Sequence, residues 1–397
     1  MSSATEIADW ASASPIIDGV LFAPPGTEGE YAPVCAVAVA GGFRGYGKGL
    51  TQSDALVSAV GEAVERWSAS QVDGEKLVRA SFRELGNEAF DPRWLCLYSA
   101  EQYGLPHFPY RPFDEDQPLH WIAGRWLDTG EPVYLPAFAT YLTSEFAPEA
   151  LCQTTSNGLA VGLSVEDASR RASLELYERD AFLTSWTALE WAVRVDIGEV
   201  EAGIAEIAAR LQAQGALLET YLVASGDPVF VAVSVGLGQG DRWPAVTLGL
   251  GAAASRNEAI GKAILEHGQT GPHFANVWRS KKASIPATPA QILTLEDHAL
   301  YYCDPAHRAE FDCWRDCSRP FEPGAHNESG RTGEDVRIAV ADLTPPELES
   351  SPFRVVRALA RGLQPIYCGI AFERLPAPRL KALLAGRTPN PAPPPIC

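Results

Sequence analysis

One spacing of acidic residues occurs three times in this chain of 397 residues. An Asp or Glu followed by Ala leads to a Glu eight residues after the acid, and to a Glu or Gln eleven residues after it. At about 100° per residue, these two positions lie within about 80° of the first acid, so each copy predicts a helix with one acidic stripe. The copies begin at Asp54, Asp167 and Glu258 and continue with Glu62 and Glu65, Glu175 and Glu178, and Glu266 and Gln269.

The acidic stripe destabilises an isolated helix, so its recurrence indicates a function for the carboxylates. Like charges three residues apart destabilise an isolated helix, while Ala, Leu, Val and Ile on the remaining surface favour burial against the rest of the fold. Ordinary exposed ion pairs are the simplest interpretation of one copy. Three copies in register favour a shared purpose instead, the gathering of oxygen ligands around cations.

A glycine-rich segment follows a strand-like run before each helix. The segments are VCAVAVAGGFRGYGKGL, CQTTSNGLAVGLS and PAVTLGLGAAASRN. A strand, a glycine turn and a helix start offer free backbone N–H groups to phosphate, although none of the three is a Walker loop or a GxGxxG fingerprint. Because Mg²⁺ is held by a few carboxylates together with nucleotide phosphates, the combination predicts a nucleotide–metal site, with Lys48, Arg66 and Arg179 to balance the phosphate charge.

Composition narrows the class of protein. The chain is 46% hydrophobic and 21% charged, as globular proteins are, and its net charge of −18 argues against binding a nucleic-acid backbone. No run approaches the roughly 18 apolar residues of a membrane span, and the N-terminus lacks the features of a secretory signal. We therefore expect a cytoplasmic protein that contacts neither nucleic acid nor membrane.

Eight cysteines are scattered along the chain and are expected to be reduced thiols. Four potential zinc ligands, Cys303, His307, Cys313 and Cys317, have the spacing C-x3-H-x5-C-x3-C. This spacing matches no common zinc finger. Either the four residues bind zinc, or a helix places Cys313 and Cys317 together as ordinary buried residues.

The remaining patterns indicate one domain of α/β (mixed α+β) class. Residues 1–33 are expected to form a loosely structured lead-in to a single domain over 34–397. The aromatic-rich and proline-rich stretch 80–150 predicts short strands and loops. Elsewhere the patterns predict a helix that ends at Gly215, strands at 217–225, 229–237 and 336–343, a helix at 350–363 and a strand at 365–372.

The chain ends in RTPNPAPPPIC, whose prolines forbid a helix or a central strand. One interpretation is a disordered tail. The other is a stiff extended arm over 386–397 that delivers the terminus to a defined place, since a stiff arm loses less entropy on docking.

These motifs together resemble the YcaO family. The run SNGLAVG…EDASRRASLELYERDA, which starts at Ser156, is similar to the family's most recognisable block, an SNG-x-A-x-G turn and a helix that ends in ExxER. GKGLTQSDALVSAVGEAVERW and EAIGKAILEHGQ resemble its first and third blocks. The resemblance runs from about residue 34 to the end, and the proline-alternating end resembles the PxPxP terminus of the azoline-forming branch.

The resemblance implies a YcaO fold in which three dispersed strand–Gly-turn–helix units converge on an ATP and Mg²⁺ site. It implies a cyclodehydratase that converts Cys, Ser or Thr of a ribosomal precursor peptide to thiazolines or oxazolines by phosphorylating the backbone amide oxygen. Backbone thioamidation or amidine-forming macrocyclisation by the same activation is an alternative, and a non-catalytic scaffold subunit is another. The PxPxP-like tail favours the azoline chemistry over the first alternative.

The resemblance also assigns residues by matching motif. Arg66 and Arg179 would order the carboxylates or meet phosphate, and the terminal carboxylate on Cys397 would reach the active site as a base or orienting group. The sequence departs from the family at Leu163, where Asn is frequent, and at Ala160, where some members carry Ser. Implied metal ligands are Glu62, Glu65, Glu175, Glu178 and Glu266, and implied ATP contacts are Lys48, Ser58, Ser156, Asn157, Glu62, Arg66, Glu175, Arg179 and Gln269.

Partners follow from the same resemblance. At 397 residues the chain is expected to lack the domain with which fused cyclodehydratases bind a leader peptide. A separate E1-like, leader-binding partner protein is therefore expected, and a flavin dehydrogenase in the same complex and a homodimer are both compatible with this arrangement.

Overall fold

The structure is a computed structural model that describes residues 4–22, 34–190, 192–198, 200–225, 229–281, 285–320 and 336–396. Its described strands form three sheets, in which every pairing is antiparallel except β8 with β12. The first sheet has the order β1 (Ile17–Phe22), β2 (Val34–Ala40), β3 (Phe43–Gly49). The second has the order β11 (Val246–Ala253), β10 (Phe230–Leu237), β9 (Leu217–Val223), β8 (Ala192–Val195), β12 (Arg319–Pro320). The third has the order β4 (Leu77–Ala80), β5 (Leu119–Trp126), β13 (Arg337–Asp342), β14 (Arg354–Arg361), β7 (Leu159–Gly162), with β6 (Pro132–Pro136) paired to β5.

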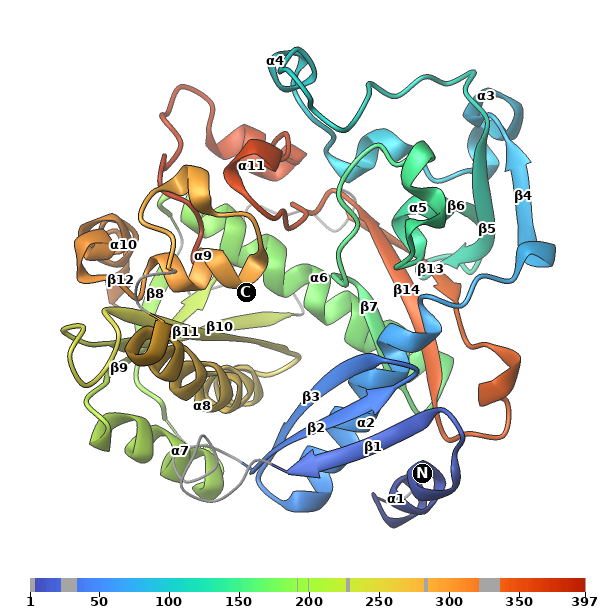
Figure 1. Cartoon of the computed structure of the whole chain (residues 1–397). Helices are drawn as coiled ribbons and strands as arrows, with labels where there is room; N and C mark the ends of the chain where they lie inside the picture. Colours follow the sequence, from blue (N-terminus) through green and yellow to red (C-terminus); the bar gives the residue numbers. More distant parts are fainter. Residues whose placement is uncertain are drawn as a thin grey trace.

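The three helices predicted from the acidic repeat are confirmed as the long helices of the fold. They are α2 (Gln52–Ser68), which packs on β2 and β3, α6 (Val165–Ala188), which packs on β7 and β14, and α8 (Arg256–Lys281), which packs on β10 and β11. In Figure 1, α6 crosses the middle of the molecule, between the sheet that carries α8 at lower left and the sheet of β4, β5 and β13 at upper right. Each sheet thus presents one acidic helix.

Shorter helices complete the described chain. They are α1 (Ala4–Ala13), α3 (Phe82–Leu85), α4 (Ala100–Tyr103), α5 (Ala137–Thr140), α7 (Ala202–Ala213), α9 (Leu295–Tyr301), α10 (Arg308–Asp316) and α11 (Pro378–Leu383). Among the described residues, no helix has the length and apolar character that crossing a membrane requires.

The first acid of each repeat starts its helix and does not join the later acids in a common task. Thr51 caps α2 by accepting a hydrogen bond from the Asp54 N–H, and the Asp54 carboxylate accepts from the Thr51 N–H at 3.1 Å in return. Ser164 accepts from the Asp167 N–H at 3.1 Å in the same way. The Glu258 N–H likewise donates to Ser255 Oγ at 3.4 Å. All three acids therefore belong to capping sequences, which satisfy N–H groups that a helix start leaves free.

Most of the glycines before the helices lie within strands, where they allow a helix to approach the sheet closely. A Cβ on Gly47 of β3 would lie 2.0 Å from the Ala55 carbonyl oxygen of α2. A Cβ on Gly251 of β11 would lie 2.4 Å from the Ala259 carbonyl oxygen of α8. The predicted glycine turns are therefore chiefly glycine strands, and their first function is to seat the acidic helices directly on the sheet.

Several predictions outside the repeat are confirmed and three are wrong. The strands predicted at 217–225, 229–237 and 336–343 are β9, β10 and β13, and α7 ends just before Gly215, whose φ is +108°. The helix predicted at 350–363 is strand β14, and the strand predicted at 365–372 contains only a short 3₁₀ helix at Ile370–Phe372. The lead-in is not loose over its described part, because it supplies α1 and β1, and β1 pairs with β2.

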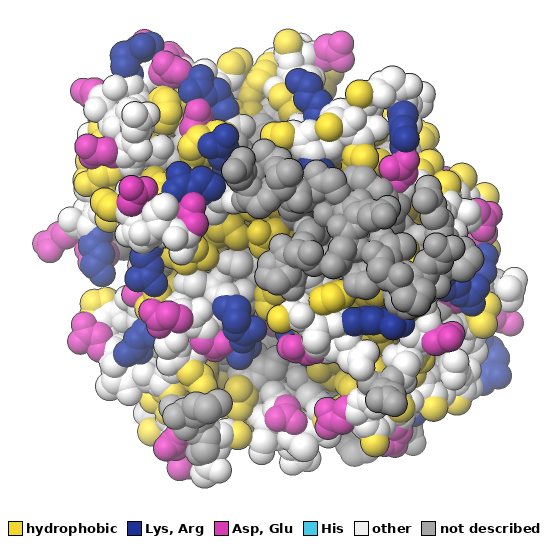
Figure 2. Space-filling model, turned by 180° about the vertical axis from the view of Figure 1, so that it is seen from behind, with side chains coloured by type: hydrophobic (Ala, Val, Ile, Leu, Met, Phe, Trp, Pro, Cys, Tyr) yellow, Lys and Arg dark blue, Asp and Glu magenta, His cyan; other side chains and the backbone are white. Residues whose placement is uncertain are grey.

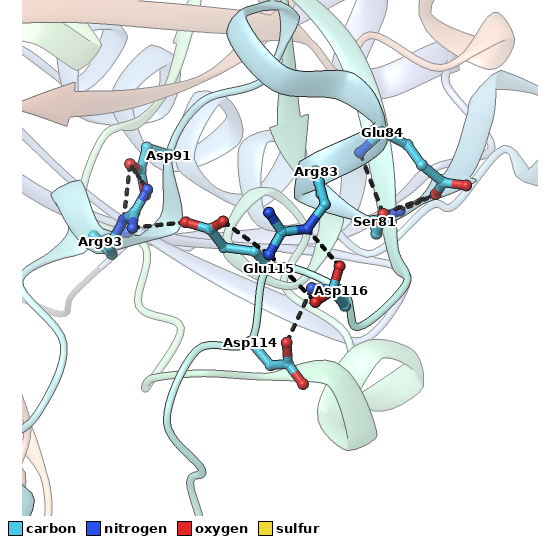
Figure 3. Close-up of polar contacts among 8 residues, drawn as sticks. All are labelled: Ser81, Arg83, Glu84, Asp91, Arg93, Asp114, Glu115 and Asp116. Carbon is cyan, nitrogen blue, oxygen red and sulfur yellow. Dashed lines mark hydrogen bonds and ion pairs between the residues drawn. The ribbon is translucent and has the colours of Figure 1, made fainter.

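Exposed ion pairs join the start of the stretch 80–150 to its middle, and the stretch contains the short strands β5 and β6 as predicted. Arg83 of α3 contacts Asp116 at 2.6 Å, and Arg93 contacts Glu115 at 2.9 Å (Figure 3). On the face opposite to that in Figure 1, acidic and basic side chains are intermixed (Figure 2). The net negative charge of the chain is therefore not gathered into one acidic patch on that face.

Gly47→Ala is expected to destabilise the protein strongly, because the added methyl would overlap backbone atoms of α2 that cannot rotate away. Overpacking typically costs about 1–3 kcal/mol and more where backbone must move. Denaturant-induced unfolding measures the effect. Gly74→Ala is the matched control, since nothing lies within 4 Å of its Cβ position. Equal midpoints for the two variants would contradict the close helix–strand contact.

Candidate active site

The three long helices carry the six side chains of the repeat, and the five glutamates among them interact with one another. Glu62 and Glu65 come from α2, Glu175 and Glu178 from α6, and Glu266 and Gln269 from α8. Burial is the main cause that raises the pKa of Glu65 and Glu178. The charges of Glu175 and Glu62 raise the pKa of Glu65 further, and those of Glu266 and Glu175 raise that of Glu178. Lys48 of β3 contacts Glu266 at 3.5 Å and so links the first unit to the third. The predicted convergence of the acidic stripes is thus present in the geometry.

Backbone N–H groups of the preceding segments hold these carboxylates in position. The carboxylate of Glu175 accepts a hydrogen bond from the backbone of Gly158, in the turn before β7. The other pairs are Tyr46 N with Glu62 at 2.9 Å, Val161 N with Glu65 at 3.1 Å and Leu250 N with Glu266 at 3.4 Å. Strand backbone therefore orients the carboxylates, in place of the phosphate that the sequence pattern assigned to it.

Burial disfavours the ionised form of the carboxylates in this cluster and so raises their pKa values. Desolvation is the main cause that raises the pKa of Glu175 to about 7, although Arg179 and Arg357 oppose it. Burial also raises the pKa of Glu178, and raises that of Glu65 well above its ordinary value. Carboxylates in this state ionise fully when cations enter, so the cluster is matched to positively charged ligands.

The two arginines of the repeat both contact its carboxylates. Arg66 lies 2.5 Å from Glu62 and also donates to the Arg44 carbonyl oxygen at 2.8 Å. Arg179 lies 3.6 Å from Glu178, and both side chains are largely buried. Each arginine therefore orders the carboxylate one turn or one residue before it.

Arg357 of β14 is a site residue that the sequence interpretation missed. Its residue is 3% exposed, and its Nε and Nη1 atoms have no hydrogen-bond partner among the described residues. Burial lowers the pKa of Arg357 to about 10, against the opposing charges of Glu175 and Glu65. The sequence predicts a helix at 350–363, which does not bring Arg357 near the acidic stripes, whereas strand β14 does. A lone arginine between Val355-Val356 and Ala358-Leu359 was the available signal.

The other candidate residues are nearby in the fold but less engaged. Asn157 lies in the turn before β7, and its Oδ1 is buried without a partner. Ser156 lies in the same turn, Ser58 lies four residues before Glu62 on α2, and Gln269 lies three residues after Glu266 on α8. Within the described part of the chain, Ser58, Ser156 and Gln269 make no hydrogen bond to the carboxylate cluster.

The donor set fits a divalent cation with a phosphate ligand. In the described ranges, no three acidic, His or Cys side chains are close enough to hold a metal ion by themselves. A small hard cation that keeps waters and shares phosphate oxygens needs only one or two carboxylates, so this spacing suits it. The unpartnered Asn157 Oδ1 and Arg357 N–H groups are buried polar atoms that such a ligand would satisfy.

The structure does not bring the four potential zinc ligands together. Cys303 is buried and donates to the Ala299 carbonyl oxygen. His307 lies 3.2 Å from Glu310, and its ring stacks on Tyr301. Cys313 and Cys317 are exposed, which also corrects their interpretation as buried residues.

The proline-rich end is packed against the second sheet over its described residues. Ile396 is fully buried in the same core as Trp186 and Tyr302. Because Trp186 follows Glu178 by eight residues on α6, the tail meets this helix about 12 Å along its axis from that carboxylate. Cys397 and its carboxylate lie outside the described residues. The tail contacts are Asn390 N with Thr187 O at 2.8 Å, Trp186 Nε1 with Ala392 O at 2.9 Å, Tyr302 Oη with Pro393 O at 2.6 Å and His298 Nδ1 with Pro394 O at 2.9 Å.

Glu178→Gln is expected to reduce the pH dependence of the stability of the ligand-free protein. The folded state raises the pKa of Glu175 and Glu178 above the ordinary 4.5, so protonation stabilises it. This contribution is fully present below about pH 4.5 and is lost as the pH rises through about 7. Between about pH 5.5 and 8.5, the thermal midpoint of the wild type should fall further than that of the variant.

Glu166→Gln, on the first turn of the same helix, is the matched control. Glu166 is exposed, and a hydrogen bond with its own backbone lowers its pKa, so its charge is constant over this pH range. The control should follow the wild type. Parallel curves for the wild type and Glu178→Gln would show that Glu178 ionises freely and would contradict the buried cluster.

Comparisons with known proteins find one family model and one curated relative that match parts of this chain. The family model described as "YcaO cyclodehydratase, ATP- and Mg²⁺-binding" matches residues 46–364. An uncharacterised protein of Methanothermobacter thermautotrophicus is 31% identical over 139 residues, which are 34% of this chain and 32% of that protein. The chain thus aligns with about a third of the length of this curated relative.

Solved structures share the fold. A heterocyclase in complex with substrate and cofactor has a TM-score of 0.71 at 20% identity, over 99% of this chain and 57% of its own. YcaO from Methanopyrus kandleri bound with AMPPCP and Mg²⁺ has a TM-score of 0.64 at 20% identity, over 91% of both chains. The E. coli microcin synthetase complex has a TM-score of 0.62 at 15% identity, over 87% of this chain and 88% of that one.

The matched residues 46–364 include every glutamate of the site, both arginines of the repeat and the buried Arg357. ATP and Mg²⁺, the ligands of the matched family, are the ligands that the carboxylate cluster fits. Because the family model spans well over half of the sequence, the chain belongs to the YcaO family.

Proposed function

We propose that this chain is an ATP-dependent cyclodehydratase. Its substrate is a ribosomally made precursor peptide, in which Cys, Ser or Thr residues become thiazolines or oxazolines. The observation that carries the proposal is the meeting of buried carboxylates from α2, α6 and α8 beside the unpartnered guanidinium of Arg357. The shared fold with a heterocyclase solved with substrate and cofactor supports the substrate class.

The chemistry requires a poor leaving group to be made a good one. When bound, ATP supplies the phosphoryl group for the amide oxygen, and Mg²⁺ supplies charge that neutralises the phosphates. Glu65, Glu175, Glu178 and Glu266 would hold the metal, directly or through water. Because backbone N–H groups already orient most of these carboxylates, little reorganisation is needed when charge develops.

The proposed reaction removes one oxygen and two hydrogens from the peptide for each ring. The side-chain sulfur or oxygen bonds to the preceding amide carbon, and that carbon loses its oxygen to phosphate while a C=N bond forms. ATP becomes ADP, and the departing phosphate takes the electron pair of the broken C–O bond. Of the two protons lost by the peptide, one from the side chain and one from the amide nitrogen, one remains on hydrogen phosphate and the other enters water.

A base must accept a proton during this sequence. The terminal carboxylate of Cys397 is our candidate, because Asn390 and Ala392 of the tail contact the helix that carries Glu178. The ordinary pKa of a C-terminal carboxylate suits an acceptor near pH 7. Arg179, beside Glu178, is the candidate for orienting the transferred phosphoryl group.

The proposal includes partner proteins. A separate E1-like, leader-binding protein would present the peptide, with a flavin dehydrogenase and a second copy of this chain as further members of the complex. The shared fold with a subunit of the E. coli microcin synthetase complex, also solved with pro-MccB17 bound, supports such an assembly.

The direct test incubates the chain with ATP, Mg²⁺, the partner and the precursor peptide and then measures peptide mass and ADP. We expect the loss of one water per ring with one ADP for each loss. A mass gain that corresponds to exchange of oxygen for sulfur would establish thioamidation instead. No mass change and no ADP in the assembled complex would favour the scaffold alternative.

Glu178→Gln is expected to lower the rate of ring formation by about 10²–10³-fold, since it removes a buried carboxylate from the metal–phosphate cluster. The rate of ADP release with saturating peptide measures the effect. Glu166→Gln on the same helix should retain activity. A Glu178→Gln variant of wild-type activity would place the chemistry elsewhere.

Removal of residues 395–397 is expected to separate nucleotide binding from turnover. The affinity for Mg²⁺ and a non-hydrolysable ATP analogue should change little, whereas ring formation should fall by about 10²-fold or more because the proposed base is lost. Pro391→Ala, at an exposed position of the same tail, is the control. Unchanged turnover in the truncated protein would exclude a catalytic role for the terminus.

A further inference from the structure

A second feature of the molecule is a cavity that Arg357 helps to line. The cavity has about 570 Å³ of empty space, part of it open to solvent, and lies between the end of β14, the segment 152–157 and the segment 363–366. Arg357, Arg374, Asn157 and Cys152 line it together with apolar side chains such as Leu176. Because Glu175 precedes Leu176 on α6, the cavity adjoins the carboxylate cluster.

Two buried guanidinium groups line this cavity, and of the two only Arg357 is influenced by nearby carboxylates, Glu175 and Glu65. Arg357 is 3% exposed and Arg374 is 6% exposed, and among the described residues neither forms an ion pair. Nη1 and Nη2 of Arg374 donate to the carbonyl oxygens of Leu95 and Gln153 at 3.3 and 2.9 Å, and the group lies over the Tyr98 ring. The Nε atoms of both arginines and Nη1 of Arg357 have no partner within the described part of the chain.

The side-chain acceptors around the cavity are largely occupied. Oε1 of Gln153 accepts from the Cys368 N–H at 2.9 Å, and Oε1 of Gln364 accepts from the Ala377 N–H at 2.8 Å. The buried amide of Asn157 has a free Oδ1, and a flip of this amide would present N–H donors instead. The lining therefore combines two positive charges and unused donors with few free acceptors, a composition that favours an anion.

We propose that this cavity holds the inorganic phosphate that the reaction releases, as hydrogen phosphate, before it leaves the protein. The proposal rests on the proposed function for the source of the phosphate. A phosphate would accept hydrogen bonds from the three unpartnered N–H donors, which otherwise remain buried at a cost, and would balance the charge of Arg374. Arg357, which reaches both the carboxylates and the cavity, marks the boundary across which the phosphate would pass.

The test is a calorimetric titration of inorganic phosphate into the protein with bound ADP and Mg²⁺, which measures the heat of phosphate binding. The ionic strength is kept constant with chloride. Neither peptide nor partner is present. A lack of phosphate binding would therefore contradict the phosphate site alone, and the cyclodehydration assay would still test the proposed function independently. We expect saturable binding of phosphate in the presence of ADP. Arg357→Gln and Arg374→Gln should each weaken it at least tenfold.

Arg361→Gln is the matched control, because Arg361 lies on the same strand and is exposed. Its phosphate affinity should equal that of the wild type. Three results would overturn the proposal. They are the absence of saturable binding to the wild type, an affinity that both cavity variants leave unchanged, and displacement of phosphate by ADP, which would assign the cavity to the nucleotide. If Arg357→Gln does not fold, the wild-type and Arg374→Gln titrations still decide the outcome.

Discussion

Glu65, Glu175 and Glu178 lie near one another inside the protein, where their charges repel and water screens them poorly. Burial of a carboxylate is unfavourable unless hydrogen bonds or positive charges compensate. The fold supplies backbone N–H groups to Glu65 and Glu175, and Arg179 and Arg357 as nearby positive charges. This compensation is partial, as the raised pKa values show, and the remaining deficit is what a bound cation would remove.

The same requirement explains the glycines and the helix starts. Carboxylates on a helix can accept hydrogen bonds from the N–H groups of an adjacent strand only if helix and strand are very close. Gly47 and Gly251 allow this approach because they place no side chain between strand and helix. The capping acids Asp54 and Asp167 then set where each helix begins. Each repeat therefore combines two separate features. Its first acid belongs to the helix cap, and its two later residues are candidate ligands.

Much of the site was predictable from sequence because its main residues belong to periodic helices. Glu62, Glu175 and Glu266 occur at fixed offsets, and the helical period alone places them on one face. Strand β14 was not predictable in this way. Both of its faces are buried, so it lacks alternation, and Arg354, Arg357 and Arg361 happen to follow a helical spacing. The strand prediction for 365–372 was wrong for a related reason, since a short apolar run does not distinguish a strand from a packed loop.

Two contacts of the site join parts of the fold that the sheets leave separate. The Val161 N–H of the third sheet donates to Glu65, whose helix packs on the first sheet, and Lys48 of the first sheet contacts Glu266, whose helix packs on the second. The carboxylate cluster is consequently also the place where the three sheets are connected to one another. Occupancy of one small volume would reduce the relative motion of all three sheets at once, so that amide hydrogen exchange far from the nucleotide would report whether the protein is loaded.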